Sequence, residues 1–179
     1  MVYMLLADGF EEIEAVYPID ILRRCSVEVK TVGVDGEYVT GSNGITVKSD
    51  ILVGETGDNI TMLILPGGPG RVNILKSEKA MALVRRCCES NTPIAAICGA
   101  PEILGEVGYL KGKKFTCYPS LEVNLDGEFV DAPVVVDGNL ITSQAAGTSE
   151  QFAFAIAEFL CGKEKADEIR EKTRANRKT

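Results

Sequence analysis

Residues 94–101 read Ile-Ala-Ala-Ile-Cys-Gly-Ala-Pro, a short apolar run that ends on a cysteine and continues at once into small residues. An unbroken apolar run is typical of a parallel strand that is buried on both faces. We therefore expect Cys98 at the carboxyl end of that strand, where ligands bind in open α/β sheets. Gly99 and Ala100 permit a tight turn into a helix, as in a nucleophile elbow, and a helix N-terminus beside the sulfur favours the thiolate.

A structural interpretation of Cys98 stands beside this functional one. Free cysteine is among the residue types most often buried in protein cores, so the thiol alone does not establish a reactive site. The remaining residues of the chain must distinguish the two interpretations.

Further apolar runs lie on both sides of this stretch, and most are followed by a helical pattern. Strands that alternate with helices predict a mostly parallel sheet with helices on both faces. We expect strands at 2–7, 26–32, 38–40, 45–47, 61–65 and 114–117, and a hairpin with an Asp-Gly turn at 134–142. We expect helices at 11–24, 72–88 and 100–107, and a last helix whose cap is Thr148 or Ser149. On this last helix, the side chains expected to face the protein core are Phe152, Ile156, Phe159 and Leu160.

Length and charge limit the classes of function. The 179 residues fit one domain, 1–179, in which 163–179 form a C-terminal helix and tail. No apolar run approaches the roughly 18 residues that cross a bilayer, and the first residues lack the basic start of a signal peptide, so we expect a cytoplasmic protein without a membrane partner. The net charge is −7, and the only basic stretch is 163–179, which argues against nucleic acid as a partner.

Two further observations concern catalysis and cofactors. The six cysteines include no C-x-x-C pair, and the chain has no histidine, the commonest general base and metal ligand. A mechanism that needs a histidine within one chain is excluded, and we expect neither a metal nor a cofactor. The loop Pro-Gly-Gly-Pro-Gly at 66–70 follows a predicted strand and frees backbone N–H groups to form an oxyanion hole, but it lacks the signature of a phosphate-binding loop.

Four motifs occur in order along the chain: Gly-Phe-Glu-Glu-Ile-Glu at 9–14, Leu-Ile-Leu-Pro-Gly-Gly at 63–68, Ala-Ala-Ile-Cys-Gly-Ala-Pro at 95–101 and Thr-Ser-Gln-Ala-Ala-Gly-Thr-Ser at 142–149. Together they resemble the ThiJ/PfpI family, and most closely the clade of the parkinsonism-associated deglycase. The resemblance implies a flavodoxin-like, three-layer α/β sandwich of the class I glutamine amidotransferase-like type. It also implies a homodimer, for which we expect the side of the first helix with Val16, Tyr17 and Ile19 as the contact.

The resemblance assigns roles to individual residues. Cys98 falls on the family's nucleophile, and Glu14 on a protonated carboxyl that donates a hydrogen bond to the sulfur. Gly68 and Gly99 match positions whose N–H groups hold an oxyanion, with Gly67 beside them. Each role has a structural alternative. Glu14 could be a first-turn glutamate that the helix dipole favours, although Glu11 and Glu12 fit that description better than Glu14 does. Gly68 and Gly99 could serve turn geometry alone.

The chain also departs from the family pattern. Tyr118 stands where the clade often has a histidine, and it is expected to line the pocket; its reference pKa near 10 makes it a poor base. Gly99 stands where the proteolytic branch has a histidine, which argues against a peptidase.

The resemblance leaves two functions open. One is a glutathione-independent glyoxalase or deglycase, in which Cys98 forms a hemithioacetal with a small 2-oxoaldehyde and Glu14 shuttles a proton. The other is a non-catalytic sensor of oxidative stress or a chaperone, in which Cys98 is oxidised to a sulfinic acid.

Overall fold

The computed structural model describes residues 1–175 and contains a seven-stranded central sheet. The strands follow the order β10-β11-β7-β6-β1-β2-β5, and only β10 runs antiparallel to its neighbour. This is a flavodoxin-like α/β fold, as the sequence predicts. The strands are β1 (Val2–Leu6), β2 (Val29–Gly33), β5 (Ile51–Leu52), β6 (Met62–Leu65), β7 (Ile94–Ile97), β10 (Val134–Asp137) and β11 (Leu140–Ser143).

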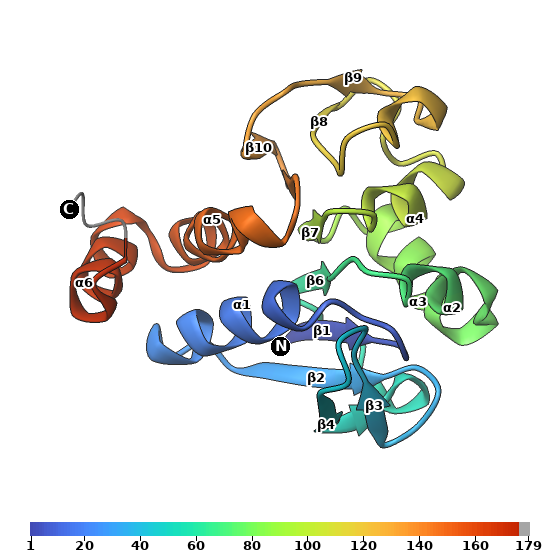
Figure 1. Ribbon diagram of the computed structural model, residues 1–179, viewed down its shortest axis with the longest axis horizontal. Coiled ribbons are helices and arrows are strands. Elements are labelled where there is room, and N and C mark those ends of the chain that lie inside the picture. Colours follow the sequence, from blue (N-terminus) through green and yellow to red (C-terminus); the bar gives the residue numbers. More distant parts are fainter. Residues whose placement is uncertain (176–179) are drawn as a thin grey trace.

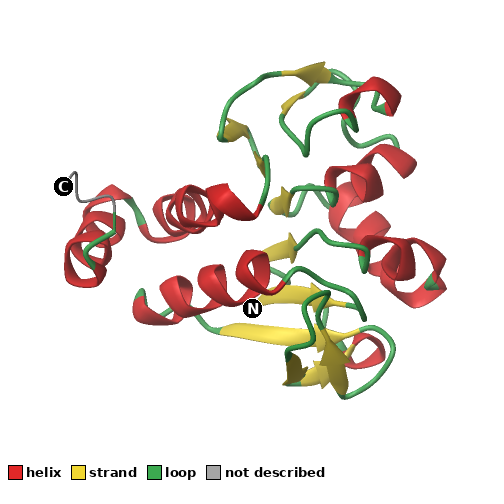
Figure 2. Cartoon of the chain, in the orientation of Figure 1, coloured by secondary structure: helices red, strands yellow, loops and turns green. Residues whose placement is uncertain are grey.

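Helices cover both faces of the sheet (Figures 1 and 2). One face carries α1 (Glu12–Arg24) and α5 (Ser149–Cys161), with α6 (Lys163–Thr173) packed against α5, and the other carries α2 (Arg71–Lys76), α3 (Glu78–Glu89) and α4 (Pro101–Glu106). Successive side chains of a strand point to opposite faces, so Met4 of β1 belongs to one apolar core and Leu5 to the other. Two buried faces therefore explain the unbroken apolar runs of the sequence.

Smaller elements lie outside the main sheet. The hairpin β3 (Tyr38–Thr40) and β4 (Thr46–Lys48) forms its own two-stranded sheet. Its turn is tied to α1, because the buried carboxylate of Glu12 accepts hydrogen bonds from the backbone N–H and the side-chain amide of Asn43, at 2.7 and 2.9 Å. Three 3₁₀ helices, Val53–Glu55, Glu122–Asn124 and Ala146–Thr148, complete the short elements within residues 1–175.

The strand expected at 114–117 is shorter than predicted and is not part of the central sheet. β8 covers only Lys114–Phe115 and pairs with β9 (Glu128–Phe129), not with the central sheet. Thr116 leaves the strand because its backbone N–H donates to the hydroxyl of Thr142 instead, at 2.9 Å.

The single helix expected at 72–88 is wrong, because the chain forms α2 and α3 with a break at Ser77. Ser77 has an extended backbone, and its hydroxyl accepts a hydrogen bond from the N–H of Ala80, which is the geometry of a helix N-cap. The strand expected at 26–32 also starts later, at Val29, because Ser26 has a φ of 65° in the left-handed region.

The C-terminal helices follow the predicted pattern with two exceptions. Phe152 and Ile156 are buried as expected, whereas Phe159 is 39% exposed. Thr148 occupies the expected N-cap position of α5, but its hydroxyl bonds to Ser143 and Ala145 and makes no capping hydrogen bond to the helix. The end of the tail expected at 163–179, residues 176–179, lies outside the described residues. No helix among residues 1–175 combines the length and the apolarity needed to cross a bilayer.

Candidate functional site

The turn after β7 forms the elbow that the sequence predicts. Cys98 follows Ile97 directly and adopts a left-handed backbone with a φ of 63°, which is rare for a residue with a side chain. Its N–H donates to the carbonyl of Ser143 at 2.9 Å, and its carbonyl accepts from the N–H of Tyr118 at 2.8 Å. These two contacts fix the thiol at the carboxyl end of the sheet.

Glu14 reaches the same edge of the sheet from α1. Glu11 is the N-cap of this helix and accepts a hydrogen bond from the N–H of Glu14 at 2.8 Å, whereas Glu12 and Glu14 lie in its first turn. Glu14 itself is fully buried, and its Oε2 accepts from the N–H of Gly67 at 2.8 Å. The loop that leads into α1 is joined to the glycine loop by backbone hydrogen bonds from Glu11 to Gly67 and from Gly70 to Gly9, at 3.1 and 2.8 Å.

Gly67 lies between the carboxyl and the thiol. A Cβ at this position would lie 2.7 Å from the Cβ of Cys98 and 2.7 Å from Oε2 of Glu14, so only glycine fits. Gly68 has a φ of 81°, and a Cβ there would lie 2.6 Å from the carbonyl oxygen of Gly9. Space and backbone geometry therefore account for both glycines, whether or not their N–H groups hold a ligand.

The pKa of Cys98 is raised, not lowered as its expected position beside a helix N-terminus predicts. Burial raises the pKa of Glu14 to about 7. Burial, followed by the charge of Glu14, raises the pKa of Cys98 to about 12, while the N–H groups of Gly68 and Gly99 act in the opposite direction. The helix after the elbow does not outweigh these effects. Between about pH 7 and pH 12 the two side chains therefore hold one proton and one negative charge between them.

A pocket of about 290 Å³ opens onto the thiol. Tyr118 lies at its rim with 50% of its surface exposed, and Glu14, although it interacts with the sulfur, is not among the lining residues. The pocket is lined by Gly68, Pro69, Arg71, Cys98, Gly99, Tyr118 and Leu121. The structure thus brings together every site residue named from the sequence, with the thiol accessible from one side and Glu14 and Gly67 packed behind it.

The family model for DJ-1/PfpI proteins matches residues 1–159 of the chain. The chain belongs to the DJ-1/PfpI family. Protein dj-1beta of Drosophila melanogaster is 38% identical over 172 residues, 93% of this chain and 92% of that protein, and its crystal structure gives a TM-score of 0.93, with 98% of each chain covered. A deglycase of Thermococcus kodakarensis is 37% identical over 150 residues, 82% of this chain and 90% of the relative. Protein DJ-1 homolog B of Arabidopsis thaliana is 39% identical over 94% of this chain, which spans 40% of that longer protein.

Two residues of this DJ-1/PfpI site, Arg71 and Leu121, are not identified from the sequence. Arg71, the first residue of α2, lines the thiol pocket, and its Nε donates to a carboxylate oxygen of Glu102 on α4 at 2.6 Å. The signal for it is local, since Arg71 follows directly on the glycine loop that the sequence does single out.

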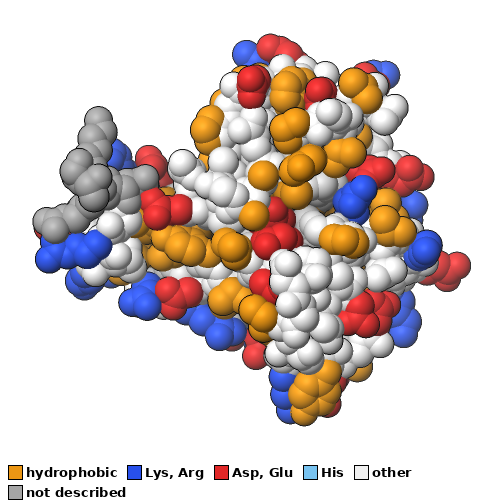
Figure 3. All heavy atoms as spheres, in the orientation of Figure 1, with side chains coloured by type: hydrophobic (Ala, Val, Ile, Leu, Met, Phe, Trp, Pro, Cys, Tyr) orange, Lys and Arg blue, Asp and Glu red, His pale blue; other side chains and the backbone are white. Residues whose placement is uncertain are grey.

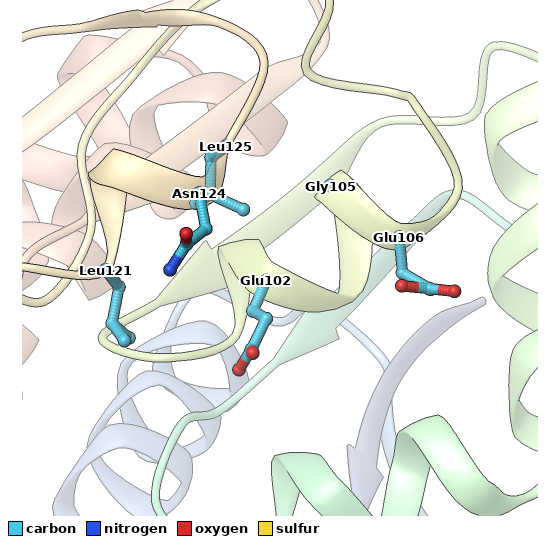
Figure 4. Close-up of a pocket in the computed structure, with 6 residues that line it drawn as sticks. All are labelled: Glu102, Gly105, Glu106, Leu121, Asn124 and Leu125. Carbon is cyan, nitrogen blue, oxygen red and sulfur yellow. The ribbon is translucent and has the colours of Figure 1, made fainter.

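A second pocket of about 230 Å³, whose lining residues are drawn in Figure 4, shares Leu121 with the first. Leu121, which lines both pockets, faces α4 together with Asn124 and Leu125, whereas Glu102 and Glu106 come from α4 itself. The ion pair of Arg71 and Glu102 therefore joins a residue of the thiol pocket to a residue of its neighbour.

The raised pKa does not by itself distinguish Cys98 from other cysteines of the chain. Burial raises the pKa of Cys87 to about 11 and that of Cys117 to about 12. Among residues 1–175, no group of three or more cysteine, aspartate or glutamate side chains is arranged to hold a metal ion.

Proposed function

We propose that the protein is a cofactor-independent glyoxalase or deglycase that acts on small 2-oxoaldehydes, or on their adducts, through Cys98. The observation that carries this proposal is the buried carboxyl of Glu14 beside a thiol that lines an open pocket. The pKa of Glu14, raised by burial to about 7, suits a group that both accepts and returns a proton near neutral pH. Relatives named deglycases, at 35–37% identity, support the same class of reaction.

The proposed reaction begins with the addition of the Cys98 sulfur to the aldehyde carbon. A C–S bond forms, the carbonyl electron pair moves to oxygen, and that oxygen takes up a proton to give a hemithioacetal. The N–H groups of Gly68 and Gly99 stabilise the developing oxyanion.

Proton transfer and hydrolysis complete the reaction. Glu14 removes the proton from the former aldehyde carbon and returns it to the neighbouring carbon, which oxidises the first carbon and reduces the second. Water then cleaves the resulting thioester, releasing a 2-hydroxy acid and the free thiol. In an adduct of a 2-oxoaldehyde with a protein amine, the C–N bond would break as the C–S bond forms, and the amine would leave with a proton. The resulting hemithioacetal would then follow the same course.

A second candidate function is a redox sensor, and one observation favours it. Oε1 of Glu14 is buried without a hydrogen-bond partner among residues 1–175, so a protonated Oε1 would be available to donate to an oxygen of a Cys98 sulfinic acid. Peroxide supplies the oxygen atoms of that acid and is reduced to water.

Lactate formation from methylglyoxal tests the first function. Wild-type protein should produce lactate without glutathione, and Cys98→Ser should abolish it. Glu14→Gln should lose about 10²- to 10⁴-fold in turnover, because it removes proton transfer, but should retain adduct formation at Cys98. Wild-type protein that makes no lactate above the Cys98→Ser background would contradict the enzyme.

Peroxide treatment followed by mass spectrometry tests the second. A sensor should hold a sulfinic acid at Cys98 in the wild type and in Glu14→Gln, which still donates a hydrogen bond. Glu14→Asp, whose carboxyl is drawn back by one methylene, should lose the sulfinic acid or oxidise further.

We also propose that the chain forms a homodimer through an exposed apolar face of α1. Ile13 is 53% and Val16 48% exposed, and together with Tyr17 and Ile45 they line an open hollow of about 480 Å³. Hydrophobic side chains gather over α1 on the face shown in Figure 3. An apolar patch of this kind on a protein surface is typical of an interface, and two-fold pairing is the commonest form of self-association.

A further inference from the structure

Arg71 occupies the space that a side chain at position 99 would fill. A Cβ on Gly99 would lie 2.7 Å from Cδ and 3.1 Å from Nε of Arg71. The arginine side chain therefore packs against the backbone of the residue that follows Cys98. Gly99 has a second role in this arrangement, since its missing side chain lets a cation from α2 approach the elbow.

The guanidinium retains donors that can reach a ligand. Its Nε is bound to Glu102, and its Nη1 makes only a long contact of 3.5 Å to the carbonyl of Gly68. Nη2 has no hydrogen-bond partner among residues 1–175. The Arg71 side chain is 26% exposed, and Arg71 is the only cationic residue among those that line the thiol pocket.

We propose that Arg71 binds an anionic oxygen group of the molecule that reacts with Cys98, so that the pocket prefers carbonyl compounds that carry a carboxylate. The ligand class is a small 2-oxo acid such as glyoxylate, whose aldehyde carbon meets the sulfur while its carboxylate meets the guanidinium. A planar guanidinium recognises a carboxylate through paired, charge-assisted hydrogen bonds. Glyoxylate would go no further than the hemithioacetal, because the carbon beside its aldehyde is a carboxylate carbon and cannot accept the proton that Glu14 moves. The reaction of other ligands rests on the proposed function, but the recognition step does not.

Glu102 sets the strength of this recognition. Its carboxylate neutralises part of the charge of Arg71 and holds the side chain in place through the 2.6 Å contact. A substrate carboxylate must therefore use the donors that Glu102 leaves free. Removing the charge with Glu102→Gln should strengthen the attraction for an anion, whereas removing the cation should abolish it.

A pair of alkylating reagents of nearly equal shape tests the proposal directly. Iodoacetate is anionic and iodoacetamide is neutral, and in both the Cys98 sulfur displaces iodide. The two rates at Cys98 are measured by peptide mapping at one pH. Because both rates are proportional to the same fraction of thiolate, their ratio does not depend on that fraction and reports the attraction of the site for the carboxylate. We expect Arg71→Gln to lower the iodoacetate-to-iodoacetamide ratio roughly three- to tenfold.

Matched variants separate local recognition from overall charge. Arg85→Gln removes the same charge from an exposed position of α3 and should leave the ratio unchanged. Arg71→Lys should keep most of the ratio, and Glu102→Gln should raise it. These two variants also test the proposal if Arg71→Gln fails to fold.

The outcomes distinguish this inference from the proposed function. An unchanged ratio in Arg71→Gln, or an equal fall in Arg85→Gln, overturns the role of Arg71 even if the protein makes lactate. If the ratio falls in Arg71→Gln but the wild type makes no lactate, the anion site is supported and only the proposed catalytic function is contradicted. Glyoxylate should also protect Cys98 from iodoacetamide better in the wild type than in Arg71→Gln, and equal protection would contradict the assigned ligand class.

Discussion

Glu14 and Gly67 are joined by a 2.8 Å hydrogen bond across 53 positions of the sequence. The bond occupies Oε2 and leaves Oε1, the buried oxygen without a partner among residues 1–175, as the atom that can carry a proton. It also determines which residue can stand between the carboxyl and the thiol, because the glycine N–H reaches Glu14 only where no side chain intervenes.

Gly67→Ala should disrupt this arrangement. The new methyl group would lie 2.7 Å from both the Cβ of Cys98 and Oε2 of Glu14, and overpacking of this kind costs about 1–3 kcal/mol of folding free energy. Gly36→Ala is the matched control, because a Cβ there meets nothing within 4 Å. Urea denaturation of both variants measures the difference, and equal stability would show that the loop adapts without loss.

The pH dependence of Cys98 alkylation should reveal the shared proton. Between about pH 7 and pH 12 the pair carries one charge, so the fraction of that charge on sulfur does not change with pH. We expect the rate with iodoacetamide to be nearly flat from pH 7.5 to 9.5 in the wild type. In Glu14→Gln the lone thiol should gain close to tenfold per pH unit below its pKa. Parallel slopes in the two proteins would contradict the coupling.

Folding stability should also depend on the ionisation of Glu14. Its pKa in the folded protein, about 7, lies above the ordinary value of 4.5, so its contribution is fully present below pH 4.5 and is lost as pH rises through 7. The free energy of unfolding of Glu14→Gln relative to the wild type should therefore rise by up to about 3 kcal/mol between pH 4 and pH 8. Thermal unfolding at the two pH values measures this difference, and a constant difference would contradict it.

Glu12→Gln provides a control of opposite sign. Burial tends to raise the pKa of Glu12, but hydrogen bonds from Asn43 and Ile45 outweigh it, so the pKa is lowered. Its stabilising effect is present above the ordinary pKa and is lost in acid. Glu12→Gln should therefore cost more stability at pH 7 than at pH 3.

Light scattering should detect the proposed dimer. The wild type should have twice the chain mass of 19.2 kDa at micromolar concentration, and Val16→Glu, which places a charge in the apolar face of α1, should have the mass of one chain. Val123→Glu changes a residue that is 76% exposed outside that face and should leave the dimer intact. A wild-type mass of one chain would exclude the dimer.

The predictable parts of the fold and of the site rest on local patterns. The elbow was predictable because a strand buried on both faces, a cysteine and a glycine follow one another within residues 94–101. The contact of Glu14 with Gly67 was not predictable from spacing, since it depends on how two loops meet; the family resemblance supplied the partner of the thiol.

Two of the errors have a common physical origin, which is competition between side-chain and backbone hydrogen bonds. Apolar periodicity continues through Ser77, but its hydroxyl caps the following helix and ends the preceding one. Thr148 was a reasonable cap, yet its hydroxyl binds Ser143 and Ala145 instead. The sequence does not single out Arg71, because a charged first-turn residue is ordinary on a surface and only its contact with the backbone of Gly99 distinguishes it.

The left-handed backbone of Cys98 lowers the folding stability of the protein at the position that carries the reactive thiol. A residue with a Cβ held at a φ of 63° costs roughly 1–2 kcal/mol relative to ordinary backbone, a cost that glycine avoids. Cys98→Gly should therefore relieve backbone strain while removing the thiol. A directed-evolution experiment that rewarded heat resistance alone would favour loss of the cysteine, so thermostable variants of this protein should be screened for alkylation of Cys98 as well as for melting temperature.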